Sequence, residues 1–331
     1  MKRRQFLAAL GSTAAAWPLA ALAQQSERVR RIGILLPFDE NDAQAQADVA
    51  AFQQALRPLG WTEGKTAQFQ IRWSGGDLRR VKSHAKELVA FQPVVILGRT
   101  TPVIAALLQE TRTIPIVFVN ISDPVGAGFA ATMARPGGNA TGFTNVEPSL
   151  GGKWVEILKE MNGKIARIAV LFDPKTSPEG GSFYLRLIQD AARSIGIETI
   201  ATPIENAAAI EQAFDAMKGA TNLGLIVQPD ITTTRNRAQI IALAAKHHLP
   251  AVYPFRFFTT EGGLASYGID VIDGYKRAAT YVDRILRGEK AGELAVQAPV
   301  KFELGINLKT AIALGLQLSP MLLGRADEVV E

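Results

Sequence analysis

The sequence predicts an α/β protein made of two doubly wound lobes, each a parallel sheet covered by helices on both faces. Two observations lead to this fold class. Short β-branched runs alternate with amphipathic stretches, and the same order of elements occurs twice along the 331 residues. The composition agrees, because 47% hydrophobic and 20% charged residues are typical of a globular chain, and the length corresponds to about two domains.

The first set of elements begins after Arg28. The expected strands are 31–36, 67–73, 94–97 and 114–118, which are β-branched runs or alternate with period two. The expected helices are about 41–59, 77–91 and 101–109. Gly60 is placed to end the first helix, and Asp77 is placed to cap the second. Strands that are joined through helices in this way lie parallel to one another.

The second set repeats this order. The expected strands are 167–172, 197–202, 223–227 and 249–253, and the expected helices are about 182–194, 207–218 and 232–247. Gly196 follows Gly60 by 136 residues, and Pro250 follows Pro115 by 135. One fold used twice is therefore expected, with a ligand crevice between the carboxyl ends of the strands of the two lobes.

The last part of the chain is expected to tie the two lobes together. After residue 268 the expected elements are a helix at about 272–287, a strand at 300–304 and a helix at about 308–314. The expected lobes are 29–145 plus about 268–292 for the first, and 146–267 plus about 293–325 for the second.

The first 23 residues have the pattern of an export signal. Basic Lys2-Arg3-Arg4 precedes an Ala/Leu-rich stretch that ends in Ala21-Leu22-Ala23, a small-x-small cleavage site. Arg3-Arg4-Gln5-Phe6-Leu7 resembles the twin-arginine motif. We expect cleavage after Ala23 and a periplasmic mature chain, with an uncleaved membrane anchor as the alternative. The chain has no cysteine, which excludes a lipoprotein anchor.

Several function classes find no support in the sequence. The lack of cysteine excludes disulfides, thiolate metal sites and cysteine nucleophiles. Three of the 36 basic residues belong to the signal, and the others nearly balance the 31 acidic residues, so nucleic-acid binding is not expected. The pattern G-x-G-x-x-A at 126–131 follows the fourth strand and not the first, which argues against a dinucleotide site. We expect no catalytic residue, metal or cofactor.

Polar and aromatic residues follow the expected strands, at the edge where ligands of parallel sheets bind. Hydroxyl groups could hold a carboxylate at a helix N-terminus, an Asp could pair with an ammonium group, and aromatic rings could enclose an apolar body. The candidate ligand-binding residues are Phe38, Thr100, Thr101, Ser122, Asp123, Asn145, Asp173, Asp230, Tyr253 and Phe255. The alternative is that Thr101, Ser122 and Thr232 only cap helices and that Asp173-Pro174 is a turn.

The chain also resembles a known family, the periplasmic substrate-binding proteins of ABC transporters, in the branch typified by tryptophan/tyrosine-binding importers. The resemblance covers nearly the whole mature chain. The segments that carry it are 60–65, 114–118, Asp123-Pro124-Val125-Gly126-Ala127-Gly128, Ala134-Arg135-Pro136-Gly137-Gly138-Asn139-Ala140-Thr141-Gly142, 262–268, 301–304, 307–310 and 325–331.

This resemblance implies a type I periplasmic-binding fold, a Venus flytrap with three hinge crossings. It implies ligand capture and delivery to an ABC permease and ATPase in the inner membrane, without chemistry. Family pockets use a Thr/Ser pair after the third strand, matched by Thr100-Thr101, and a segment matched by Ser122-Asp123. Polar groups after the second-lobe strands correspond to Asp173 and Asp230. Arg99 stands where many members have glycine, so direct binding of an anion is an alternative.

We therefore expect an extracytoplasmic solute-binding monomer. Its expected ligand is a small carboxylate-bearing molecule, such as an aromatic or branched amino acid, enclosed by closure of the lobes. An extracytoplasmic α/β enzyme and a ligand-sensing module are the alternatives.

Overall fold

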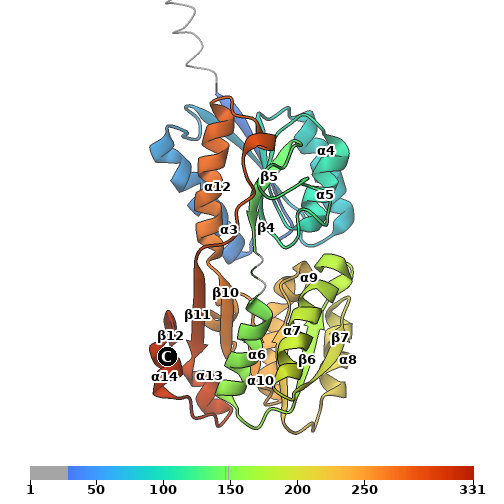
Figure 1. Ribbon diagram of the computed structural model, residues 1–331. Helices are drawn as coiled ribbons and strands as arrows, with labels where there is room; N and C mark the ends of the chain where they lie inside the picture. The colour runs from blue at the N-terminus through green and yellow to red at the C-terminus, as the bar shows by residue number, and fades with distance from the viewer. Residues whose placement is uncertain (1–28, 146, 148) are drawn as a thin grey trace, which may run out of the picture.

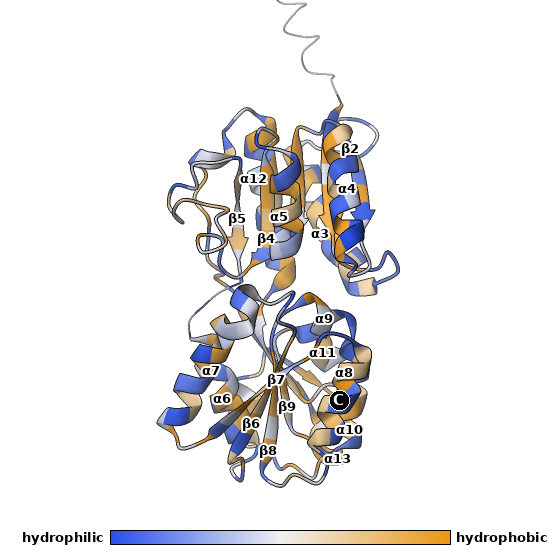
Figure 2. Cartoon of the chain, turned by 90° about the vertical axis from the view of Figure 1, so that its right-hand side faces the viewer, coloured by the Kyte–Doolittle hydropathy of each residue, from blue (hydrophilic) through white to orange (hydrophobic). Residues whose placement is uncertain are grey.

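The computed structural model describes residues 29–145, 147 and 149–331. The predicted export signal lies outside the described residues. Figure 1 shows two lobes, one above the other, with the chain crossing between them at the centre of the molecule. Figure 2 shows that the strands at the centre of each lobe are largely apolar, whereas polar residues gather on the outer faces of the helices. Among the described residues, no helix combines the length and the hydropathy that a membrane span requires.

The first sheet contains five parallel strands in the order β2-β1-β3-β4-β5. These strands are β1 (Arg30–Leu36), β2 (Ala67–Trp73), β3 (Val95–Arg99), β4 (Ile116–Ile121) and β5 (Ala140–Thr144). The sequence did not predict β5, which has no continuous apolar run. At Gly142 of β5, φ is 154° and an added Cβ would lie 2.0 Å from the Phe118 carbonyl oxygen, so β5 approaches β4 more closely than any side chain allows.

Helices cover both faces of the first sheet. They are α3 (Ala43–Leu56), α4 (Leu78–Ala90), α5 (Thr101–Glu110) and α12 (Val271–Leu286). The carboxylate of Asp77 accepts a hydrogen bond from Arg79 N at 2.8 Å and caps α4, as predicted. Helix α12 returns from the second half of the chain and packs on α3 and β4 (Figure 1). The first lobe is thus completed by a segment that is distant in sequence.

The second sheet contains seven strands in the order β12-β11-β10-β9-β8-β6-β7. These strands are β6 (Arg167–Phe172), β7 (Glu198–Pro203), β8 (Leu223–Val227), β9 (Ala251–Tyr253), β10 (Ala265–Ile269), β11 (Phe302–Asn307) and β12 (Glu328–Val330). Strands β10 and β11 pair antiparallel, and the other pairs are parallel. Strand β10 pairs as far as Ile269 and β12 adds an edge beyond residue 325, so this sheet extends past both predicted limits.

The helices of the second lobe are α6 (Leu150–Met161), α7 (Ser182–Ser194), α8 (Ala207–Ala216), α9 (Ile231–Arg235), α10 (Arg237–Lys246), α11 (Arg256–Thr260), α13 (Leu308–Ala313) and α14 (Pro320–Gly324). The sequence did not predict α6. The helix predicted at 232–247 is broken at Asn236, which has φ −96° and ψ 20° and donates from its side-chain amide to Thr232 O at 2.8 Å. The short helix α9 is therefore a separate element at the edge of the second lobe that faces the first.

Equivalent residues of the two halves have the same structural role. Gly60 (φ 97°) and Gly196 (φ 71°) each follow the helix between the first two strands of their half, in a conformation that favours glycine. The carbonyl oxygens of Pro115 and Pro250 each accept a hydrogen bond at 2.9 Å from the adjacent strand, and each proline immediately precedes its strand. The α/β fold with parallel-sheet lobes that the sequence predicted is confirmed.

Candidate ligand-binding site

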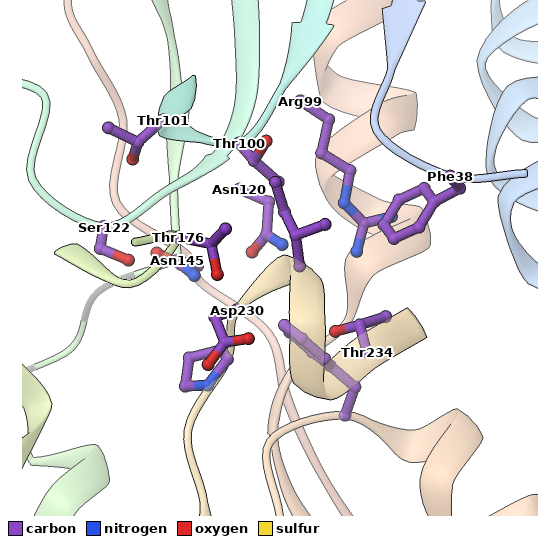
Figure 3. Close-up of a pocket in the computed structure, with 13 residues that line it drawn as sticks. Phe38, Arg99, Thr100, Thr101, Asn120, Ser122, Asn145, Thr176, Asp230 and Thr234 are labelled. Atoms are coloured by element: carbon purple, nitrogen blue, oxygen red, sulfur yellow. The ribbon is translucent and has the colours of Figure 1, made fainter. Parts of the chain in front are cut away.

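A cavity lies between the lobes, where the carboxyl ends of strands from both sheets face each other. It measures about 380 Å³ when the open space toward its mouth is counted. Its lining residues are Phe38, Arg99, Thr100, Thr101, Asn120, Ser122, Asn145, Thr176, Pro229, Asp230, Ile231, Thr234 and Phe255. Figure 3 shows ten of them with labels. Both lobes contribute, so a ligand here would touch both.

The structure brings most of the predicted site residues into this lining. Those that line the cavity are Phe38, Thr100, Thr101, Ser122, Asn145, Asp230 and Phe255. Asp123, Asp173 and Tyr253 do not line it. Sequence reasoning missed Asn120, Thr176 and Thr234. A polar Asn120 within the apolar run that ends β4 was the available signal for the first of these.

Two of the three residues outside the lining have structural roles. The Asp123 carboxylate accepts a hydrogen bond from Gly126 N at 2.7 Å and closes a turn. Tyr253 is the last residue of β9 and is 1% exposed, and its ring stacks on that of Phe258 at 4.9 Å between centroids. Tyr253 thus packs in the core of the second lobe.

Asp173 does not line the cavity but forms hydrogen bonds with Asp230 and Thr232. One carboxylate oxygen accepts from Lys175 N at 2.8 Å and the other from Thr232 Oγ1 at 2.5 Å. Its backbone N–H donates to Asp230 Oδ2 at 3.0 Å. These bonds fit the predicted alternative that Asp173-Pro174 is a turn. Asp173 orders this turn after β6 and holds the neighbouring Asp230.

Among the described residues, Asp230 is the one acidic member of the lining, and it caps α9. Its carboxylate accepts from Thr233 N at 2.7 Å, from Asp173 N at 3.0 Å and from Ser177 Oγ at 3.1 Å. Burial raises the pKa of the Asp230 carboxyl to about 6, although these hydrogen bonds oppose the rise. A cation beside Asp230 would favour its ionised form.

Five lining residues have buried polar atoms without a hydrogen-bond partner in the described part of the chain. These atoms are Arg99 Nε, Thr100 Oγ1, Asn120 Oδ1, Asn145 Oδ1 and Thr176 Oγ1. Buried polar groups are normally paired because an unpaired one loses its bonds to water. Thr100 (φ 76°) and Asn120 (φ 59°) also have left-handed backbones, which is costly for a β-branched threonine. Such a cluster is typical of a site built to receive a polar ligand.

Ser122 and Arg99 of the first-lobe lining each have one polar partner within the protein. Ser122 Oγ lies 3.4 Å from Tyr184 OH of α7, a hydrogen bond that crosses between the lobes. Arg99 ends β3, and its Nη1 donates to Asp48 Oδ2 at 2.6 Å. Its guanidinium lies 4.7 Å from the centre of the Phe38 ring. Arg99 lines the cavity, but an internal carboxylate already balances its charge.

Comparison with known proteins identifies the family. Residues 32–330 match the family described as ABC transporter substrate binding protein. The chain belongs to this family. It is a family of substrate-binding proteins and not of enzymes, and the predicted solute-binding role is confirmed.

A curated protein and two solved structures are similar to this chain. A tyrosine-binding protein of Clostridioides difficile (strain R20291) is 26% identical over 267 residues, which is 80% of this chain and 76% of that protein. A conserved domain protein from Vibrio cholerae is 26% identical, with a TM-score of 0.84 over 91% of this chain and all of its own. An ABC domain from Streptococcus pneumonia in complex with L-Trp is 22% identical, with a TM-score of 0.84 over 92% and 100% of the two chains.

Substrate-binding proteins of this fold take up and release ligand as their lobes close and open. Two arginines of the second lobe contact the first lobe near the cavity. Arg237 Nη1 donates to Asp42 Oδ2 at 2.7 Å, and both side chains are less than 15% exposed. Arg235 Nη1 donates to Gly75 O at 3.1 Å. These contacts require the lobes to be close together, so opening must break them.

Proposed function

We propose that this protein binds an α-amino acid with an aromatic or branched side chain between its lobes and delivers it to an ABC importer. The observation that carries the proposal is the cluster of unpartnered polar atoms beside Asp230, contributed by both lobes. A zwitterion supplies donors and acceptors of the kind that these atoms lack. The names of two relatives, which bind tyrosine or L-Trp, support the same ligand class.

In this arrangement the ligand's ammonium group lies near Asp230 and the amide oxygens of Asn120 and Asn145. Charge-assisted hydrogen bonds to the Asp230 carboxylate would be the strongest single contact. The ligand's carboxylate lies near Thr100 and Thr101, at the start of the ten-residue helix α5, whose free N–H groups and dipole favour an anion. The hydroxyl of Thr100 adds a donor at that point.

The aromatic rings of the lining would enclose the ligand's side chain. Phe38 comes from the loop after β1 and Phe255 from the loop after β9, so the two rings approach from opposite lobes. Burying an apolar or aromatic group between them removes its surface from water. This burial accounts for a preference for ligands with an aromatic or branched side chain. It does not depend on the hydrogen bonds to the ligand's ammonium and carboxylate groups.

We also propose an export pathway for the protein and the transporter subunits that it works with. The pattern of residues 1–23 supports export through the twin-arginine pathway, cleavage after Ala23 and a periplasmic mature protein that is not a lipoprotein. Its partners would be the permease and ATPase subunits of an importer in the inner membrane. The mature protein would act as a monomer.

The proposal is tested with the purified mature chain. Native mass spectrometry shows whether a molecule of amino-acid mass co-purifies, and calorimetric titration with the twenty common L-amino acids then gives the affinities. We expect one or a few aromatic or branched amino acids to bind far more tightly than the others. A panel without measurable binding, together with a co-purified molecule of another class, would refute the proposal.

A further inference from the structure

The two ends of the cavity differ in chemistry. In Figure 3, Ser122, Asn145, Thr176 and Asp230 lie toward one end, while Arg99 and Phe38 lie together at the other. If the ligand's ammonium group is held at Asp230, as proposed above, the far end of its side chain reaches Arg99. The groups around Arg99 then decide which side chains are accepted.

The guanidinium of Arg99 is held in place and has one N–H without a hydrogen-bond partner in the described part of the chain. The side chain is 2% exposed, one face of the group lies against the Phe38 ring at 4.7 Å, and Nη1 is bonded to Asp48. Its Nε is buried and has no hydrogen-bond partner within the described residues. The Tyr275 hydroxyl, likewise buried and unpartnered among the described residues, belongs to a ring whose centre lies 6.0 Å from the guanidinium carbon. Because a guanidinium only donates, any group that a ligand adds to this site must be an acceptor. A hydrocarbon group placed there would leave the N–H unpaired.

The charge at this end of the cavity is already balanced. Asp48 is fully buried and accepts hydrogen bonds from Arg99 and, at 2.8 Å, from Gln44 Nε2. The pair Arg99–Asp48 is therefore neutral as a unit. A second carboxylate brought by a ligand would lie near Asp48 without a countercharge of its own, in a place shielded from water. A neutral acceptor avoids this repulsion.

We propose that Arg99, stacked on Phe38 and neutralised by Asp48, is a specificity-determining residue that selects ligands with a neutral hydrogen-bond acceptor at the end distal to the ammonium group. A phenolic hydroxyl or a carbonyl group meets this requirement. A phenyl ring has no acceptor, and the indole of tryptophan has only an N–H donor. This inference rests on the proposed amino-acid-binding function and extends it to the side-chain end of the ligand.

The wild-type protein is titrated with three ligands that differ at one position: L-tyrosine, L-phenylalanine and 4-carboxy-L-phenylalanine. We expect L-tyrosine to bind at least about tenfold more tightly than either analogue, because a site built to bond a hydroxyl rejects a ligand that lacks it. Equal affinities for L-tyrosine and L-phenylalanine, or a preference for the carboxylate analogue, would overturn the inference and leave amino-acid binding intact. If none of the three binds, the inference is overturned, and the titration with twenty amino acids decides the proposed function separately.

Two variants assign the selectivity to Arg99. The double variant Arg99→Met with Asp48→Leu replaces the buried ion pair by apolar groups, an exchange that proteins often tolerate. We expect its tyrosine-to-phenylalanine affinity ratio to fall to about one. Asp48→Asn leaves the Arg99 charge unbalanced, and we expect the preference to move toward 4-carboxy-L-phenylalanine.

The matched control is Arg72→Gln with Glu87→Gln, which removes an ion pair on the outer face of the first lobe. It should keep the wild-type ratio. Circular dichroism and thermal melting establish that each variant is folded. A folded Arg99→Met/Asp48→Leu variant that keeps the wild-type ratio would overturn the inference, since a purely structural ion pair would change both affinities equally.

Discussion

The two lobes contribute to the cavity in different ways. The first lobe supplies Thr100, Asn120 and Asn145, whose buried oxygens have no partner in the described part of the chain. The second lobe supplies Asp230, whose carboxylate is already held by three hydrogen bonds from its own lobe. The second lobe therefore presents a charge that is already held in place before the ligand binds. Most of the new hydrogen bonds that form on ligand binding are expected to involve the first lobe.

The largest expected effect comes from the preorganised charge. Asp230→Asn keeps a helix-capping side chain at α9 but removes the negative charge, so we expect ligand affinity to fall by roughly ten- to a hundredfold. Titration calorimetry measures the change. Asp123→Asn is the matched control, because Asp123 caps a turn outside the cavity lining. Unaltered binding in Asp230→Asn would show that the charge does not contact the ligand.

The same carboxylate should make binding depend on pH. With a pKa of about 6, Asp230 in the ligand-free protein is ionised at pH 7 and mostly protonated at pH 5. A ligand ammonium prefers the ionised form, so affinity should decrease as pH falls through 6, by roughly tenfold between pH 7 and pH 5. Affinity measured across this range in the wild type should decline, whereas Asp230→Asn should give a flat profile. A flat wild-type profile would rule out an ammonium partner for Asp230.

A first-lobe hydroxyl should have a smaller effect. Thr100→Val preserves the shape of the side chain and the strained backbone while removing the unpartnered Oγ1, so we expect affinity to fall by about three- to tenfold. Thr221→Val, at an exposed position outside the lining, is the control. If Thr100→Val bound ligand as well as the wild type, the first lobe would not provide new hydrogen bonds at this residue.

The smallest expected effect concerns the contact between the lobes. Asp42→Asn retains the cap of α3 and removes the charge that meets Arg237. We expect the ligand-free protein to open further, seen as a larger radius of gyration in solution scattering, and affinity to fall by about two- to fivefold. Asp77→Asn changes the cap of α4 and serves as the control. Identical scattering of Asp42→Asn and wild type would mean that this ion pair does not favour closure.

The parts of the fold that were predicted are those whose residues carry a local signal. Apolar strands such as β1 and β8, and helices with a cap such as Asp77, follow from periodicity and side-chain chemistry. The elements that were missed depend on distant partners. Strand β5 is held by β4 on one side and by a bridge from Phe143 to Gln297 on the other, and no pattern within 140–144 reveals either neighbour.

The site was predicted from the rule that ligands bind at the ends of parallel strands, and the rule's limits account for the errors. It does not tell which side chains at a strand end turn toward the cavity. Tyr253 and Phe255 are two residues apart, yet only Phe255 lines the cavity, because β9 ends between them and the chain bends. Asn120 was missed because the predicted strand ended at residue 118, whereas β4 continues to Ile121 with Asn120 in a left-handed conformation.

The contact at Gly142 links the interior of the first lobe to the cavity lining. Since a methyl group there would meet the Phe118 backbone at 2.0 Å, β5 has to lie where only a hydrogen atom fits. That strand leads directly into Asn145, so its position also sets where this lining residue lies. Gly142, which is not part of the lining, thereby helps to place a residue that is.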